Sequence, residues 1–334
     1  MSVRVQQLNA DSTFLLTFFP SFAPKKLSPR LPGDFTILLD PWLQGHASML
    51  HPAFQISHHT STPALHSLQH LPQLPDIILI SQDKPDHCHR ETLCSLPRTS
   101  DTAILATPAA AKRIRSWGHL DKEQVHVIPT YNPLDEETVV RIPLPSYSST
   151  SKDGEITITN IPTKRDVAGL HNAICITYQP SSSVLTASRP PRQYPNSSSS
   201  VVLSDDGIPG SPDSRQRSHA NQEQVLSIIY TPHGVSPSTL RPYISNHLAP
   251  LDALPVSLLF HGLTTAENPW YMGGRVANGA PGGVQIAEQF GVRHWIRAHD
   301  EEKINKGVAT LLTKMRPYGP EKRTYGCYVG CLSL

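Results

Sequence analysis

The sequence has no hydrophobic run long enough to cross a membrane. Its longest apolar stretches, Phe14–Phe19 and Ile77–Ile80, are far shorter than the roughly 20 residues that a spanning helix needs. Met1–Gln7 also lacks the basic-then-apolar order of a secretory signal peptide. We therefore expect a soluble, cytoplasmic protein without a membrane span.

Charge is scarce as well. Charged residues make up 17% of the chain, and 29 basic side chains against 27 acidic ones leave a formal net charge of +2. No basic run stands out, so neither a nucleic acid nor an acidic membrane surface is suggested as a partner. A nucleic-acid-processing function is disfavoured for the same reason. We expect a small-molecule substrate, and the composition leaves the oligomeric state open.

Two further absences narrow the fold and the chemistry. No Gly-x-Gly-x-x-Gly and no phosphate-binding loop motif is present, which argues against a doubly wound nucleotide-binding fold. The five cysteines are odd in number and match no zinc module, so we expect reduced thiols. They are Cys88, Cys94, Cys175, Cys327 and Cys331.

What the chain does contain is a succession of short strand patterns with few helices. This order favours an α+β fold, an αββα sandwich of two mixed sheets faced by helices. The predicted strands cover 13–19, 35–39, 77–80, 103–106, 125–128, 137–142, 156–159, 173–178, 225–230, 255–260 and a last one from His294. The predicted helices cover 90–96, 107–117 and 282–290, with a closing helix that starts at 300–302.

We expect one domain over residues 1–334 with an insertion at 180–222. The insertion is rich in serine and proline and has too little apolar surface to offset the entropy of ordering, which predicts disorder. The apolar pattern resumes after it, and the strand at 225–230 is expected to pair with the strand at 173–178. Because closure entropy grows slowly with loop length, a domain tolerates such an insertion.

Candidate ligands for a metal follow the predicted strands. The apolar run Ile77–Ile80 leads into a polar loop that ends in Asp86 and His87, a pair able to hold a metal. The loop Ser81–His87 resembles the metal-binding loop of the metallo-β-lactamase superfamily, H-x-H-x-D-H directly after a strand. Gln82 and Lys84 stand where that pattern has its first two histidines.

The resemblance extends along most of the chain. Asp40-Pro-Trp-Leu43, at the end of the second predicted strand, is similar to the ascorbate-phosphate-lactonase-like branch of the superfamily. In that setting an aspartate such as Asp40 braces the metal loop, whereas the alternative is a turn-forming Asp-Pro.

The resemblance implies a single metal site. Of the family's first site only one histidine position, His171, is kept. The second site keeps four competent positions, although His233 replaces the family's bridging aspartate. One oxygen and three nitrogen ligands suit Zn²⁺, with Fe²⁺ or Mn²⁺ as alternatives. The implied ligands are Asp86, His87, His233 and His299.

Three residues are candidates for catalysis beside the ion. The Lys84 ammonium is placed to take over part of the field of the missing metal, and its alternatives are a surface lysine or a partner of Asp83 or Asp86. His171 and His261 are candidates for proton transfer, and for each the alternative is a plain loop histidine.

Residues 45–73 are rich in histidine and proline, and we expect a loop over the active-site face. Its histidines either shape a substrate pocket or lie on the surface, and surface positions are favoured for most of them. They are His46, His51, His58, His59, His66 and His70.

Together these features predict a mononuclear metal-dependent hydrolase. Its substrate would be a lactone, an ester or a phosphoester-type small molecule. The alternative is a degenerate, non-catalytic member of the superfamily that binds a ligand or acts as a scaffold.

Overall fold

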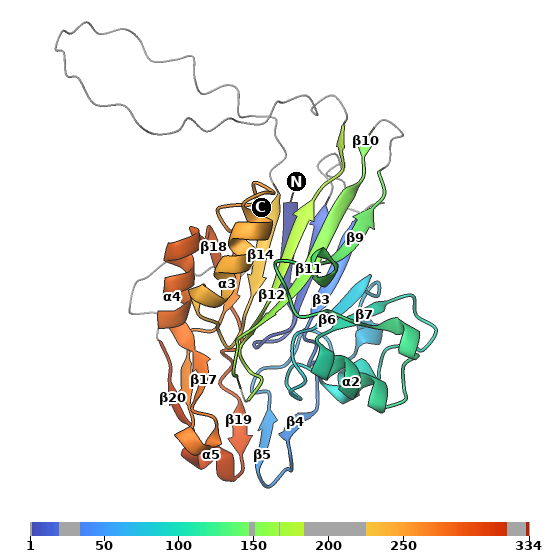
Figure 1. The fold of residues 1–334 in the computed structure, drawn as a ribbon. Helices are drawn as coiled ribbons and strands as arrows, with labels where there is room; N and C mark the ends of the chain where they lie inside the picture. The colour runs from blue at the N-terminus through green and yellow to red at the C-terminus, as the bar shows by residue number, and fades with distance from the viewer. Residues whose placement is uncertain are drawn as a thin grey trace, which may run out of the picture.

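Two mixed β-sheets lie face to face in the computed structural model, with helices on both outer sides (Figure 1). The structure describes residues 2–19, 34–146, 151–166, 168–183, 225–318 and 332–333. The predicted αββα sandwich is confirmed by this layering. The insertion predicted at 180–222 lies, apart from its first residues, outside the described residues, as do Cys327 and Cys331.

The first sheet runs in the order β21-β1-β2-β3-β6-β7-β8 within the described residues. Strands β3, β6, β7 and β8 are parallel, and β1, β2 and β3 pair antiparallel. The bounds are β1 Ser2–Gln7, β2 Phe14–Phe19, β3 Phe35–Leu39, β6 Ile77–Ile80, β7 Ala103–Ala106, β8 Val125–Val127 and β21 Leu332–Ser333.

The second sheet runs in the order β18-β15-β14-β12-β11-β9. Strand β14 pairs antiparallel with β12, with Ile174 opposite Tyr230, as the sequence predicts for these two segments. Strands β14, β15 and β18 are parallel. The bounds are β9 Val140–Leu144, β11 Gly154–Pro162, β12 Asn172–Gln179, β14 Leu226–Tyr230, β15 Leu258–His261 and β18 His294–Arg297.

Alternation along the buried strands builds three hydrophobic clusters. In β6, Ile77 and Leu79 point into the core between the sheets, whereas Ile78 and Ile80 point outward. The outward side chains pack under helices α1 and α2, and a third cluster packs under α3 and α4. A strand buried on both faces must be apolar throughout, which explains why these strands read as continuous hydrophobic runs.

The helices are short. The α-helices are α1 Arg90–Leu93, α2 Pro108–Ser116, α3 Pro237–Tyr243, α4 Gly279–Phe290 and α5 Val308–Leu312. A π-helical turn covers Ile244–Leu248, and 3₁₀ turns cover Leu68–His70, Lys122–Gln124, Glu136–Thr138 and Trp270–Met272.

Small sheets complete the described fold. One joins β4 His46–Met49, β5 Gln55–His58 and β19 Ile304–Lys306, and another joins β16 Thr265–Glu267, β17 Arg275–Asn278 and β20 Lys314–Arg316. Strands β10 Ser151–Lys152 and β13 Ser182–Ser183 form a third.

Three expectations about the chain path are wrong. Residues 300–302 start no helix, because Asp300 and Glu301 turn their carboxylates onto backbone amides of other segments, and β19 follows. The histidine-rich stretch is not simply a loop, because its first part forms the β4–β5 hairpin. The strand expected at 137–142 begins only at Val140, after a 3₁₀ turn that Asp135 caps.

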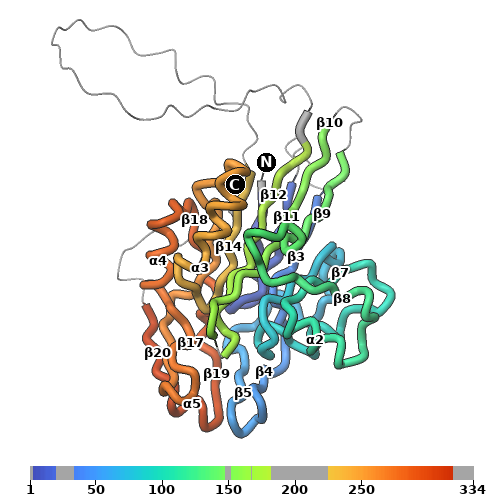
Figure 2. The backbone as a smooth tube through the Cα atoms, in the orientation of Figure 1, coloured from blue at the N-terminus to red at the C-terminus, as the bar shows by residue number. Residues whose placement is uncertain are grey.

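The parallel strands of both sheets end at one edge of the sandwich. Asp40 follows β3, the loop Ser81–His87 follows β6, and His233 and His299 follow β14 and β18. Loops that leave the carboxyl ends of parallel strands are the usual place for a functional site on a rigid sheet. In Figure 2, β14 and β18 of the second sheet lie to the left of β7 and β8 of the first sheet. The histidines that follow β6, β14 and β18 nevertheless form one group.

Candidate metal centre

The loop after β6 is fixed by one buried carboxylate. Asp40 accepts hydrogen bonds from the Ser81 backbone amide at 2.7 Å and from Ser81 Oγ at 2.5 Å. Its Oδ2 also accepts from His87 Nδ1 at 2.7 Å and from the Tyr230 hydroxyl at 2.7 Å. Asp40 is completely buried, so these donors replace the water it loses. Of the two readings of Asp40, the structure therefore shows the bracing one.

His233 and His299 are oriented in the same manner as His87. His233 Nδ1 donates to the Val276 carbonyl at 3.0 Å, and His299 Nδ1 lies 3.0 Å from Asp11 Oδ2. Each ring thus has an oxygen acceptor at Nδ1 that fixes the tautomer and leaves Nε2 as the donor atom for a metal. This is the usual arrangement of histidines that bind metals in proteins.

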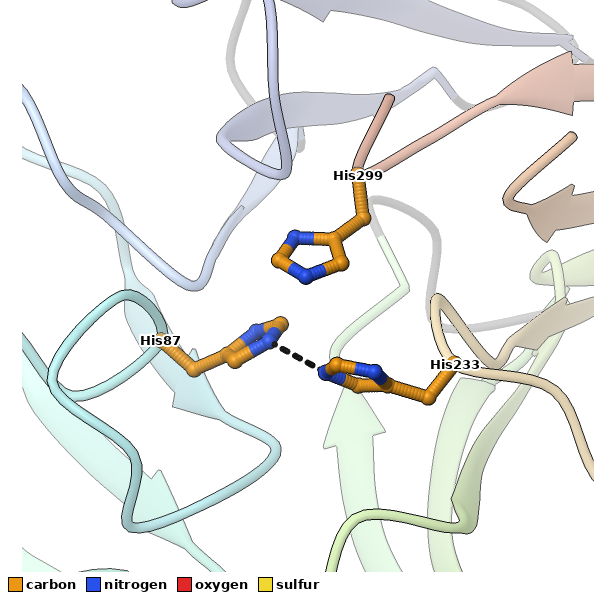
Figure 3. A group of neighbouring side chains, drawn as sticks. All are labelled: His87, His233 and His299. Carbon is orange, nitrogen blue, oxygen red and sulfur yellow. Dashed lines mark hydrogen bonds between the residues drawn. The ribbon is translucent and has the colours of Figure 1, made fainter. Parts of the chain in front are cut away.

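The three rings converge on one point (Figure 3). One ring nitrogen from each of His87, His233 and His299 lies within 4.8 Å of the other two. His87 Nε2 and His233 Nε2 are 3.1 Å apart, although the acceptors at both Nδ1 atoms assign the ring proton to the other side. Two lone pairs at this distance require a proton or a cation between them. The residues therefore fit a bound metal ion.

The electrostatic environment shifts the pKa values of His87 and His233 in opposite directions. Burial by itself lowers the pKa of His87, but the carboxylates of Asp86 and Asp40 outweigh it and leave that pKa raised. Burial and the neighbouring His299 and His87 hold the pKa of His233 well below its usual value. His233 is therefore neutral, which is the form that binds a metal.

Asp86 lies beside the three histidines and not within their group. Its Oδ2 is 3.7 Å from His299 Nε2, and its Oδ1 is buried without a hydrogen-bond partner among the described residues. Burial raises the pKa of Asp86, but His87, Lys303 and His299 outweigh it and leave the pKa lowered. An ionised, unpartnered carboxylate oxygen at this place fits a fourth ligand of an ion.

Two charged residues near the histidines, Asp11 and Lys303, were not among the residues predicted from the sequence. Asp11 is fully buried in the turn between β1 and β2, and its Oδ2 accepts from Lys303 Nζ at 2.8 Å as well as from His299. Lys303 Nζ also lies 3.8 Å from Asp86 Oδ2 and 5.5 Å from the centre of the Trp42 ring. The ammonium that accompanies the histidines is thus that of Lys303.

The three candidates for catalysis, Lys84, His171 and His261, have different partners in the structure. Lys84 Nζ pairs with Asp83 Oδ1 at 2.8 Å. His171 places Nδ1 at 2.8 Å from the Gly234 carbonyl and Nε2 at 3.0 Å from the Arg275 carbonyl. Both ring nitrogens of His171 therefore lie at hydrogen-bonding distance from backbone carbonyl oxygens. This agrees with the alternative interpretation of His171 as a plain loop histidine.

His261 ends β15 and is completely buried. Its Nδ1 donates to the Gly262 carbonyl at 2.6 Å, and its Nε2 has no hydrogen-bond partner within the described part of the chain. Burial lowers the pKa of His261 to about 4, so the ring is neutral at neutral pH. In this conformation no solvent reaches its free nitrogen.

Gln82 fills the place of the first missing histidine. It is buried, and its side-chain amide donates to the Leu170 carbonyl at 2.7 Å and to Asn172 Oδ1 at 3.2 Å. The amide therefore ties the metal loop to the start of β12. A second ion would need a ligand here that this residue type supplies poorly.

The histidine-rich stretch contributes one buried support. His59 Nδ1 lies 2.5 Å from Glu301 Oε2, and its ring packs against Trp42 with 3.9 Å between centroids and the ring planes tilted by 36°. The Glu301 carboxylate also accepts from the backbone amides of Thr60 and Ser61. None of the histidines of this stretch joins the group formed by His87, His233 and His299. A cavity of about 700 Å³ is lined by Pro85 of the metal loop and by Cys88, His46, His89, Arg90, Arg98, Arg113 and other residues.

No family model and no curated protein matches the chain. Among solved structures, it is similar to an isothiocyanate hydrolase from Delia radicum gut bacteria, with 12% identity, a TM-score of 0.47 and coverage of 91% of this chain and 86% of the other. A mutant of the CmlA beta-hydroxylase shows 13% identity, a TM-score of 0.46 and coverage of 90% and 46%. YhfI from Bacillus subtilis, described as a metallo-beta-lactamase fold protein, shows 11% identity and a TM-score of 0.41, with coverage of 89% of this chain and 86% of the other.

These values are too low to transfer an activity, so only the chain's own residues bear on its function. Within the described residues, no helix is both long and apolar enough to cross a membrane.

Proposed function

We propose that this chain is a metal-dependent hydrolase of the metallo-β-lactamase superfamily with a single ion. The observation that carries the proposal is the convergence of His87, His233 and His299, each with its Nδ1 held by an oxygen acceptor. Asp86 would be the fourth ligand through its unpartnered Oδ1. Three nitrogen donors and one oxygen donor suit Zn²⁺, and Fe²⁺ or Mn²⁺ also accept this set.

A divalent ion held there supplies Lewis-acid activation of water and of a substrate carbonyl or phosphoryl oxygen. The protein's own groups prepare the site for it. Asp40 and Asp11 fix the rings of His87 and His299, so that little reorganisation is needed when the ion binds. Lys303 adds a positive charge beside the centre, suited to an oxyanion or a phosphoryl group.

The proposed substrate is a small lactone, ester or phosphoester. The Asp40-Pro-Trp-Leu43 segment supports the lactonase-like branch, and the neighbouring positive charge supports a product or transition state that carries negative charge. A second candidate function is a non-catalytic ligand-binding or scaffold protein. The hydrogen-bonded amide of Gln82 in place of a metal ligand favours that candidate.

Metal content separates these functions first. We expect elemental mass spectrometry of the purified protein to find about one ion per chain, because His87, His233 and His299 form one group of neighbouring donor nitrogens. The metal-loaded protein is then assayed with generic lactones, esters and phosphodiesters. One ion with turnover supports the hydrolase, and one ion without turnover on any of them supports the binding protein. A protein that binds no ion, even after reconstitution, contradicts both the metal site and the hydrolase.

Two lysine variants test which ammonium serves the site. Lys303→Met is expected to lower kcat/KM by about a hundredfold, because a preorganised charge beside the reacting oxygen contributes several kcal/mol. Its metal affinity should stay the same or rise, since a positive charge near the ion is lost. Both quantities are measured on the same preparations, by steady-state kinetics and chelator competition.

Lys84→Met is the matched control. Lys84 pairs with Asp83, both side chains are partly exposed, and ion pairs that solvent reaches contribute little, so we expect kcat/KM to change by less than about threefold. The reverse order of effects would transfer the catalytic charge to Lys84.

A further inference from the structure

Exposed large hydrophobic side chains gather at one end of the molecule. Eight of the eleven among the described residues lie between Trp270 and Tyr318. The most exposed of these eight are Trp270 at 87%, Leu311 at 86% and Tyr271 at 64%. Isolated apolar residues are common on protein surfaces, but a concentration of this kind marks an interaction surface. We call this surface the apolar end and define it by Trp270, Tyr271, Val308, Leu311, Leu312 and Met315.

Contacts between the elements show that these side chains share one surface. Strand β20 pairs with β16, which places Met315 opposite Ala266, close to the turn that carries Trp270 and Tyr271. Thr313 Oγ1, directly after α5, donates to Asn268 Oδ1 at 2.7 Å and ties the helix to the same turn. Figure 2 shows α5, β17, β19 and β20 together at one end of the tube.

Helix α5 has almost nothing to cover within the protein. Ala309 is its only buried residue, and Val308, Leu311 and Leu312 are exposed. The helix is fastened by its backbone, because the Val308 and Ala309 amides donate to the Ala53 and Phe54 carbonyls at the tip of the β4–β5 hairpin. A short helix that presents leucines to water while its backbone is anchored indicates a surface that binds something apolar.

Basic side chains surround the apolar ones. Residues 304–318 contain Lys306, Lys314 and Arg316 and no aspartate or glutamate. All three basic residues are exposed. The residue opposite Lys314 on the neighbouring strand β16 is Glu267, whose carboxylate is paired with Arg275 on β17. Strand β20 alternates Lys314, Met315 and Arg316, so cations flank an exposed apolar side chain directly. Trp and Tyr with an apolar body and a polar tip, leucines, and flanking cations form the combination that fits an anionic lipid surface.

We propose that the apolar end docks the protein on a membrane surface that contains anionic lipids. Trp270 and Leu311 enter the interface, and Lys314 and Arg316 contact the headgroups. The chain lies on the membrane and does not span it. The net charge of +2 averages over the whole sequence and hides this local excess, which is why composition suggests no acidic membrane as a partner.

The apolar end is also connected to the metal centre. Strand β17, which follows the Trp270–Met272 turn, carries the Val276 carbonyl that fixes His233 and the Arg275 carbonyl that faces His171. Docking would therefore bring a lipid surface close to the strand that supports the candidate site. The docking itself does not depend on catalysis, so it can be tested without a known substrate.

The test is sedimentation of the full chain with vesicles. We expect binding to vesicles of phosphatidylcholine mixed with phosphatidylserine, and binding at least about tenfold weaker to phosphatidylcholine alone, because each basic residue near an anionic surface contributes to affinity. Raising the salt concentration should weaken it. Equal binding to both vesicles, or none to either, would overturn the proposal.

Variants of the apolar end test whether vesicle binding uses these residues. The double variant Trp270→Ser with Leu311→Ser is expected to lose at least about tenfold in vesicle affinity, and Lys314→Glu with Arg316→Glu to lose the preference for phosphatidylserine. Leu134→Ser is the matched control, because Leu134 is 94% exposed but lies in a turn distant in sequence and outside the apolar end. Circular dichroism confirms that the variants are folded.

A second copy of the chain is the competing occupant of this surface. Analytical ultracentrifugation decides the matter. A stable dimer that dissociates in the Trp270→Ser, Leu311→Ser variant, with no vesicle binding by the wild type, would overturn membrane docking. A monomer that binds the mixed vesicles through these residues supports it.

Discussion

Replacing His87 with alanine is expected to weaken metal binding by at least about a thousandfold and to abolish turnover. Sites of this kind bind Zn²⁺ with on the order of 12 kcal/mol, and one of the three convergent ligands would account for roughly a third, or about 4 kcal/mol. His87 is also the ring that approaches His233 to 3.1 Å, so its loss opens the centre. Chelator competition and elemental analysis measure the effect.

His89→Ala is the control for that variant. His89 is buried close to His87, but its ring nitrogens face Thr92 Oγ1 and the His46 carbonyl, so it does not point at the centre. We expect its loss to cost stability and to leave metal affinity within about threefold of the wild type, because both of its ring nitrogens face other partners and neither is a ligand of the centre. Retention of full metal content by the His87 variant would refute the ligand set.

Replacing Asp40 with asparagine is expected to cost about 3–5 kcal/mol of stability, because one partner of a buried, fully bonded charge is removed. Four donor contacts converge on the carboxylate, and an amide presents two N–H groups of its own to them. Asp40 has a φ of 38°, a conformation that asparagine also tolerates, so the change tests the charge and not the backbone. Denaturant unfolding measures the loss.

The same variant should weaken metal binding by about 10–100-fold, the usual cost of losing the acceptor behind a histidine ligand. Asp76→Asn serves as the comparison. Asp76 accepts from the amide and the hydroxyl of Thr36 at 2.7 Å each and ties β3 to β6, with no part in the centre. It should lose stability without losing metal affinity. Equal metal affinity in the Asp40 variant and the wild type would show that His87 needs no support.

Several of the central strands could be predicted because local rules decide them. Strands β3, β6 and β7 occupy the predicted residues, since each is a compact apolar run bounded by polar or turn-forming residues. His87, His233 and His299 follow such strands, and parallel strands bring their carboxyl ends together. The β4–β5 hairpin was missed because histidine and proline suggested a loop, although Gln55-Ile-Ser-His58 alternates as a strand does.

Asp11 and Lys303 could not be predicted by the same rules. Asp11 lies in a turn where aspartate is ordinary, and Lys303 follows a run of acids that resembles the start of a helix. Only the packing of the first loop against the residues after β18 makes them partners. The one available signal is that Asp11 lies in the turn between two strands of the sheet that contains β3 and β6, and β1 Ser2–Gln7 was not among the predicted strands.

The contact between Asp11 and His299 has a consequence for the way the protein is made. The two residues are 288 positions apart, yet the tautomer of His299 depends on Asp11. During synthesis Asp11 leaves the ribosome long before β18, and contacts of high sequence separation form after local ones. The ring of His299 therefore gains its acceptor only when nearly the whole chain has been made. The proposed metal site would be completed at the end of translation, and an ion would be bound after it.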